Sequence, residues 1–128
     1  MSSLVFHEVD RGRWADFEAL FAARGGPSYC WCMVWRATPK EVTGPPGKKA
    51  AMQARIAGGV PVGLLAYQDD EPVAWCSIAP RDTYRPLGGL EPTPGERVWS
   101  LACMFIRRDL RGQGIAHQLI AAAVAHAR

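Results

Sequence analysis

A basic, glycine-flanked turn at residues 111–116 is the part of this sequence best suited to chemistry. It reads Arg111-Gly112-Gln113-Gly114-Ile115-Ala116. Because glycine has no Cβ, its two glycines allow an anion to approach the main chain closely. The first N–H groups of a helix have no partner within the helix and lie at the positive end of its dipole. If a helix follows, the turn is therefore expected to bind a phosphate group.

Two elements must position this turn, and the pattern of apolar residues predicts both. A central strand is predicted over residues 97–106 and a helix over residues 112–128. The apolar residues of this helix recur on one face, which we expect to pack on a sheet: Ile115, Leu119, Ile120, Ala123 and Ala127.

The turn resembles the acyl-coenzyme A signature Gln/Arg-x-x-Gly-x-Gly/Ala of the GNAT superfamily of N-acetyltransferases. Strand, turn and helix follow in the order of that family, and apolar Ile106 stands five positions before Arg111. The family often has proline where this chain has Arg108, a difference that affects only the shape of the loop. The resemblance implies an α/β fold of the α+β kind, a mixed, mainly antiparallel sheet flanked by helices.

The resemblance also implies acetyl-coenzyme A as the cofactor and a primary amine as the acceptor of the acetyl group. The pyrophosphate would bind to the loop, at Arg111, Gly112, Gln113, Gly114, Ile115 and Ala116. Main-chain groups of Met104, Phe105 and Ile106 would run along the pantetheine arm and the acetyl carbonyl. The identity of the amine is not indicated.

The rest of the chain reads as the other elements of one domain, residues 1–128. The short polar connector between two apolar runs predicts an antiparallel hairpin. Proline and glycine predict loops over 38–47 and 81–96. The remaining predicted elements are a strand over 4–9, a helix over 11–24 capped by Asp10, a helix over 48–57, and the hairpin strands 62–67 and 73–78.

Two segments each have two interpretations. The run 29–36 contains two tryptophans, two cysteines and a methionine. Aromatic-rich segments are more often core than pocket, so we favour core packing under the first helix over the wall of an acceptor pocket. The loop 81–96, which contains Arg81, Tyr84 and Arg85, either borders the active cleft or is a solvated connection.

No motif singles out a catalytic residue. A free alkyl amine titrates near pH ~10, so the acceptor must lose a proton. The candidate bases are His7, Glu91, Glu96 and His117, while His117 and His126 are both expected on the surface of the last helix. Cys103 shares the central strand with Ser100, but nothing nearby in sequence lowers its pKa, which argues against a nucleophile. The tyrosines all precede the central strand: Tyr29, Tyr67 and Tyr84.

The sequence stops after the helix that follows the loop, whereas a complete GNAT fold continues with a strand, a helix and a hairpin. A truncated chain, a second chain that supplies these elements, or a remnant that binds without turnover would each explain this. The alternative function is therefore a coenzyme A binding module. The sheet edge left open beside the central strand predicts a homodimer.

Composition limits the classes of protein and ligand that remain possible. The 128 residues are 48% hydrophobic with a net charge of +3, which excludes disorder and suits a polyanionic small ligand. No lysine- or arginine-rich run supports nucleic-acid binding. No stretch resembles a secretory leader or a membrane span, so we expect a cytoplasmic protein with buried thiols at Cys30, Cys32, Cys76 and Cys103. A metal site with Cys30 and Cys32 together with Cys76, Cys103 or His7 is a third hypothesis, but one Cys-x-Cys pair is insufficient and no metal is expected.

Overall fold

The structure, a computed structural model, describes residues 4–28, 30–37, 44–86, 95 and 97–128. Its strands are β1 (Leu4–Glu8), β2 (Leu64–Gln68), β3 (Glu71–Pro80) and β4 (Trp99–Ile106), and its helices are α1 (Trp14–Ala22), α2 (Pro45–Ala57) and α3 (Ile115–Ala127). Three single 3-10 turns join them: η1 (Arg11–Arg13), η3 (Arg81–Thr83) and η4 (Arg108–Leu110).

The strands form one antiparallel sheet in the order β1-β2-β3-β4. The predicted hairpin is confirmed as β2 and β3, and the predicted α+β fold is confirmed with it. Strands β1 and β4 are the two edges. Within the described residues, β4 pairs only with β3, so its outer edge has no partner strand there.

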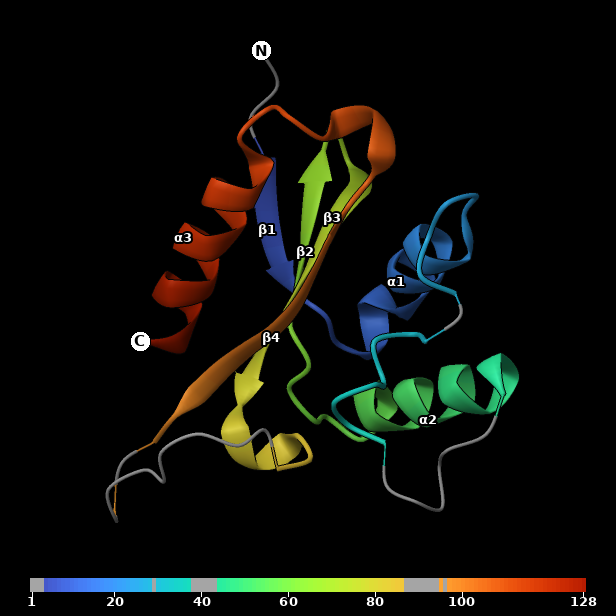
Figure 1. Cartoon of the computed structure of the whole chain (residues 1–128), viewed down its shortest axis with the longest axis vertical. Helices are drawn as coiled ribbons and strands as arrows, with labels where there is room; N and C mark the ends of the chain where they lie inside the picture. Colours follow the sequence, from blue (N-terminus) through green and yellow to red (C-terminus); the bar gives the residue numbers. More distant parts are fainter. Residues whose placement is uncertain (1–3, 29, 38–43, 87–94, 96) are drawn as a thin grey trace.

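Helices cover both faces of the sheet (Figure 1): α3 lies on one face, and α1 and α2 on the other. Because side chains alternate along a strand, β3 contributes to two cores. Trp75 packs with Phe17 and Phe21 on the α1 face. Cys76 packs with Leu119 on the α3 face. Burial on both faces explains why β3 is apolar along most of its length.

Three predicted helix boundaries differ from the structure. Helix α2 begins at Pro45 instead of residue 48, since proline lacks an N–H and fits the first helical turn. Helix α3 begins at Ile115 instead of 112, because Gly112 and Gly114 adopt positive φ. The helix after Asp10 starts as the turn η1, and the Asp10 side chain makes no capping bond.

The apolar segment 30–37 lies mainly in the core. Residues Cys30 to Met33 are buried, and the Trp31 ring stacks 5.8 Å from that of Phe21. The core interpretation is confirmed for this part, whereas Val34 and Trp35 are exposed. Tyr29, residues 38–43 of one predicted loop, and most of the other, residues 87–94 and 96, lie outside the described residues. None of the helices described has the length and apolar character needed to cross a bilayer.

Candidate functional site

The loop between β4 and α3 has the backbone conformation that its glycines allow. Gly112 has φ +81° and Gly114 φ +79°, the left-handed region that other residues rarely adopt. A Cβ added at either position would meet no atom within 4 Å. Glycine is therefore favoured at both positions by the backbone conformation and not by lack of space, and the space beside the loop is open to a ligand.

Main-chain donors gather at this loop. Within the described part of the chain, no main-chain acceptor bonds the N–H groups of residues 112–117. The first such bond runs from the N–H of Gln118 to the carbonyl of Gly114, at 3.4 Å. No side chain caps the start of α3, a helix of 13 residues. Free N–H groups at the positive end of a helix dipole favour an anion.

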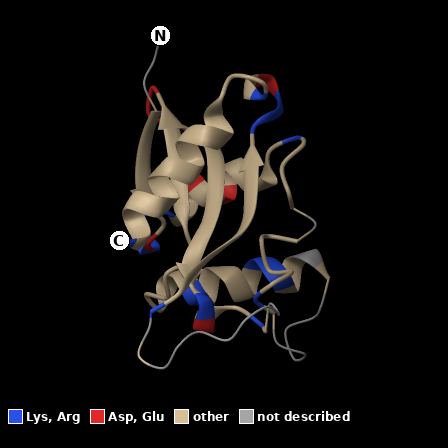
Figure 2. Ribbon diagram, turned by 60° about the vertical axis from the view of Figure 1, so that its left-hand side comes forward, with Lys and Arg blue, Asp and Glu red and all other residues tan. Residues whose placement is uncertain are grey.

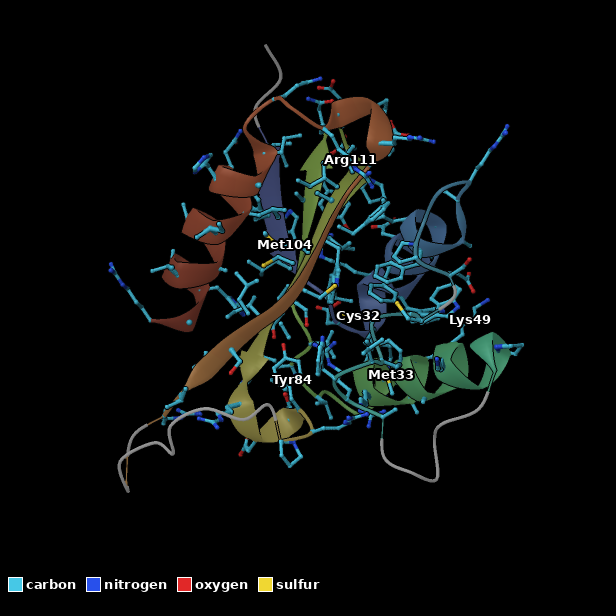
Figure 3. All side chains as sticks on the ribbon, viewed as in Figure 1. Cys32, Met33, Lys49, Tyr84, Met104 and Arg111 are labelled. Atoms are coloured by element: carbon cyan, nitrogen blue, oxygen red, sulfur yellow. The ribbon has the colours of Figure 1, made fainter. Side chains whose placement is uncertain are left out.

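Arg111 folds back onto the end of β4. Its Nε donates to the carbonyl of Ile106 at 2.9 Å, and its guanidinium carbon lies 5.7 Å from the centre of the Phe105 ring. Figure 3 shows Arg111 at this end of the strand. Three residues predicted from sequence are thus in contact, and the Ile106 carbonyl is occupied by Arg111.

The loop is also basic. Residues 107–114 include three arginines and one aspartate. Arg107 binds Asp109 at 2.7 Å and Glu71 at 3.0 Å, and the hydrogen bond from Arg107 lowers the pKa of Asp109. Figure 2 shows charges at this turn, whereas α3 has no charged residue before Arg128. Arg107 thus offsets the acidic groups and the loop stays positive.

The side chains of β4 divide between the two faces of the sheet. Cys103 and Phe105 pack against the α1-face core, and Ile106 packs against the α3-face core. Met104 lies opposite Cys76 of β3 and is 37% exposed. The predicted stretch Met104 to Ile106 therefore contacts both cores through its side chains.

Of the four candidate bases, the structure describes two, His7 and His117, and neither lies on β4. His7 is on β1, at the opposite edge of the sheet, with its ring 5.5 Å from that of Tyr67. His117 is exposed on α3, as predicted, whereas His126 is half-buried with its ring edge-on to Trp99. Glu91 and Glu96 lie outside the described residues.

The sequence profile of the Acetyltransferase (GNAT) family matches residues 13–128. The chain belongs to the GNAT acetyltransferase family. Its predicted resemblance is thereby confirmed, and the loop at the start of α3 lies within the matched range.

Solved acetyltransferases have the same fold as this GNAT chain. Aminoglycoside N-acetyltransferase AAC(6')-Iy in complex with CoA has a TM-score of 0.61 at 15% identity, covering 98% of this chain and 69% of that one. Ribosomal-protein-alanine N-acetyltransferase from Brucella melitensis biovar Abortus 2308 has a TM-score of 0.61 at 18% identity, covering 98% and 71%. A predicted acetyltransferase with acetyl-CoA from Clostridium acetobutylicum has a TM-score of 0.58 at 15% identity, covering 98% of this chain and 73% of that one. No curated protein sequence matches this chain.

A buried polar cluster of this GNAT chain was not predicted from sequence. We call it the Arg36 cluster. Arg36 is only 3% exposed, and its guanidinium donates to Ser77 Oγ and the Val62 carbonyl at 2.7 Å, and to the Tyr84 hydroxyl at 3.2 Å. The members are Cys32, Arg36, Trp75, Ser77, Tyr84 and Cys103. The one available signal was an arginine at the end of an apolar run.

Cys32 is the acidic group of the Arg36 cluster. Its sulfur accepts hydrogen bonds from Arg36 Nη1 at 3.1 Å and Trp75 Nε1 at 3.2 Å. A hydrogen bond from Cys103, the charge of Arg36 and the Trp75 bond outweigh burial and lower the pKa of Cys32 to about 5. The same bond with Cys32 raises the pKa of Cys103, which agrees with the argument against Cys103 as the nucleophile of acetyl transfer.

The metal hypothesis fails within the described residues. No group of three His, Cys, Asp or Glu residues among them is placed to hold a metal ion. Cys76 packs in the α3-face core, whereas Cys32 and Cys103 pack with the α1-face core. The sheet thus separates Cys76 from the other two thiols. Burial raises the pKa of Cys76 to about 12, so this thiol is neutral.

Proposed function

We propose that this GNAT chain binds acetyl-coenzyme A and transfers its acetyl group to a primary amine. One observation carries the proposal: an open glycine loop with unbonded N–H groups leads into α3, after β4 and the turn η4. The solved relatives described with CoA and acetyl-CoA support it. The bound cofactor would supply the acetyl thioester.

The residues present fit a pyrophosphate. It would accept hydrogen bonds from the unbonded main-chain N–H groups of Gly112, Gln113, Gly114, Ile115 and Ala116, whereas the Arg111 N–H already donates to the Arg108 carbonyl. The open space above Gly112 and Gly114 admits its oxygens, and the positive loop attracts them. The Arg111 side chain, bonded to the Ile106 carbonyl, would shape the loop and add charge.

The outer edge of β4 would receive the pantetheine arm. Main-chain groups of Met104, Phe105 and Ile106 that point away from β3 have no strand partner in the described residues. Amide groups of an extended ligand can pair with such an edge as an added strand does. We assign the arm to this stretch for that reason.

A matched pair of glycine substitutions tests the phosphate loop. Gly114→Glu adds bulk and negative charge to the loop. Gly59→Glu makes the same change in the turn after α2, where φ is +81° and the space is equally open. We expect Gly114→Glu to weaken coenzyme A binding by at least ~100-fold, the effect of losing about 3 kcal/mol. Gly59→Glu should leave affinity unchanged in calorimetry, and equal affinities of the two variants would refute the assignment.

The alternative is a coenzyme A binding module without turnover. Loss of the thioester absorbance, which the chain's own four cysteines do not disturb, separates the two when an amine panel is added. The panel would include aminoglycosides and peptides with N-terminal alanine, the acceptors suggested by the names of two relatives. Binding without thioester loss would support the module, and absence of binding would refute both functions.

We also propose a homodimer that pairs through the first part of the outer edge of β4, from Trp99 to Cys103, which leaves Met104 to Ile106 for the pantetheine arm. Leu101 and Met104 of β4 are 38% and 37% exposed, and α3 exposes Ile120 and Val124 on the same side of the sheet as Met104. A second copy would cover these side chains. Light scattering should give twice the chain mass, and Leu101→Asp should shift the particle toward monomer. A monomer at high concentration would exclude the dimer.

A further inference from the structure

The Arg36 guanidinium requires a buried negative charge. Arginine stays protonated in proteins, and an unpaired buried charge is strongly unfavourable. Its hydrogen-bond partners in the described residues are two main-chain carbonyls, two hydroxyls and the Cys32 sulfur, with no carboxylate among them. Burial raises the pKa of Tyr84, so its hydroxyl stays neutral. The Cys32 thiolate is therefore the counter-charge.

Cys103 lies next to this thiolate. It is directly opposite Ser77 in the β3–β4 register, and Ser77 Oγ accepts from Arg36 at 2.7 Å. Such cross-strand pairs place their Cβ atoms ~4.5–5.5 Å apart on one face. The Cys103 thiol donates a hydrogen bond to the Cys32 sulfur and also lies 3.9 Å from the Met104 carbonyl. Cys103 is half-buried and Cys32 is buried, so peroxide would have to reach the Cys32 sulfur from the Cys103 side.

We propose that Cys32 and Cys103 form a peroxide-reactive dithiol, in which Cys32 is the attacking thiolate and Cys103 the resolving thiol. The Cys32 sulfur attacks one peroxide oxygen and the O–O bond breaks, giving a sulfenic acid and hydroxide, which takes a proton to become water. The Cys103 sulfur then attacks the sulfenic sulfur, loses its proton, and releases a second water as the S–S bond forms. Peroxide is reduced and the two thiols are oxidised by two electrons.

The surroundings favour reaction at this pair over the other cysteines. Arg36 and Trp75 donate to the Cys32 sulfur, which stabilises the thiolate, the reactive form. Cys76 is fully buried on the other face of the sheet. Cys30 is as buried as Cys32, but its thiol donates to the Pro27 carbonyl at 3.7 Å, whereas the Cys32 sulfur accepts hydrogen bonds.

The disulfide would change the protein at β4. It joins the segment 30–37 to the strand residue preceding Met104, and it removes the thiolate charge beside Arg36. Reduction by a dithiol would restore both. The chemistry of the pair needs no coenzyme A, so it stands independently of the proposed transfer activity.

Mass spectrometry of the full chain after hydrogen peroxide tests the proposal. Blocking of free thiols, followed by trypsin, should give the peptide 25–36 joined to the peptide 98–107. Cys30→Ser should keep this link, which assigns it to Cys32. In Cys103→Ser, dimedone should label Cys32 as a sulfenic acid. Cys76→Ser should react at the wild-type rate.

The rate of disulfide formation as a function of pH gives a second measurement, which needs no variant at Cys32. Disulfide formation in the wild-type chain should remain within about threefold between pH 6 and 8, because Cys32 is already ionised. A thiol with an ordinary pKa of ~8.5 would react more slowly by more than tenfold at pH 6. A link through Cys30, labelling at Cys76, or that tenfold loss at pH 6 would overturn the proposal.

Discussion

The Arg36 guanidinium donates a hydrogen bond to the Cys32 sulfur across 3.1 Å, with both side chains buried. Further bonds from Arg36 reach the Val62 carbonyl, Ser77 on β3 and Tyr84 after η3. The Arg36 side chain thus connects its own segment, 30–37, with Val62, β3 and Tyr84. This ion pair determines how stability responds to pH and to substitution.

Stability should depend on pH through Cys32. Its pKa is lowered from 9.0 to about 5 in the folded chain. The folded state therefore binds fewer protons than the unfolded state between these values. The Cys32 contribution is complete above pH 9, falls as pH decreases, and is lost below 5, with a slope of at most about 1.4 kcal/mol per pH unit.

Urea unfolding of the wild type and of Cys32→Ser at several pH values measures this slope. The stability difference between the two should grow from pH 5 to pH 9. Cys76→Ser is the control and should add no slope below pH 9, since the pKa of Cys76 is raised to about 12. A difference that is flat with pH would show that Cys32 is a neutral thiol.

Replacing either Arg36 or Cys32 should lower the free energy of unfolding, and the two losses should not be additive. Arg36→Met leaves the Cys32 thiolate without its cation, and should lower the free energy of unfolding by about 3 kcal/mol or more. In the double variant with Cys32→Ser, the loss should fall at least ~1 kcal/mol short of the sum. Arg36→Met combined with Tyr67→Phe should be additive, because Tyr67 bonds Asp16 and Arg13 instead.

Tyr84→Phe should destabilise the fold, because it removes the Tyr84 hydroxyl and leaves the ring in place. That hydroxyl contacts Ser77 Oγ at 2.9 Å, Arg36 Nη2 at 3.2 Å and the Ser100 carbonyl at 3.2 Å. Leaving these buried groups unsatisfied costs about 1–3 kcal/mol. Urea unfolding should show a lower midpoint with an unchanged m-value. A midpoint equal to that of the wild type would mean that solvent replaces the hydroxyl.

Arg111→Ala should weaken coenzyme A binding by about tenfold, the loss of one charge-assisted interaction of ~1.5 kcal/mol. The guanidinium adds charge at the loop and bonds the Ile106 carbonyl. Arg11→Ala is the matched control, since Arg11 also donates to a main-chain carbonyl, that of Ala57 after α2, at 2.7 Å. Calorimetry should show normal affinity for Arg11→Ala, and equal losses in both variants would argue for a general charge effect.

Local patterns were sufficient for the elements around the phosphate loop. The glycines at 112 and 114, the apolar strand before them and the apolar face after them are all short-range signals. The hairpin β2–β3 follows from its short polar connector in the same way. Helix boundaries shifted at Pro45 and Ile115, where proline and positive φ set where each helix begins, and the first predicted helix starts as η1. Ile120, which we predicted on the packed face of α3, is exposed.

The Arg36 cluster could not be predicted by such signals. Its residues come from positions 32, 36, 75, 77, 84 and 103, which only the packing of β3, β4 and segment 30–37 brings together. Cys32 and Cys103 read alike in sequence, as thiols among apolar neighbours. Their pKa values diverge because Cys103 donates a hydrogen bond to Cys32, whose sulfur also accepts from Arg36 and Trp75.

The sequence by itself determined the family, the fold class and the place of the glycine loop before α3, because those depend on residues adjacent in the chain. Only the tertiary structure decided which face of the sheet each β4 side chain occupies. It also places His7 at the opposite edge of the sheet and pairs the buried Arg36 guanidinium with the Cys32 sulfur. Electrostatic and hydrogen-bond energies fall off over a few ångströms, so they depend on spatial neighbours that sequence spacing does not reveal.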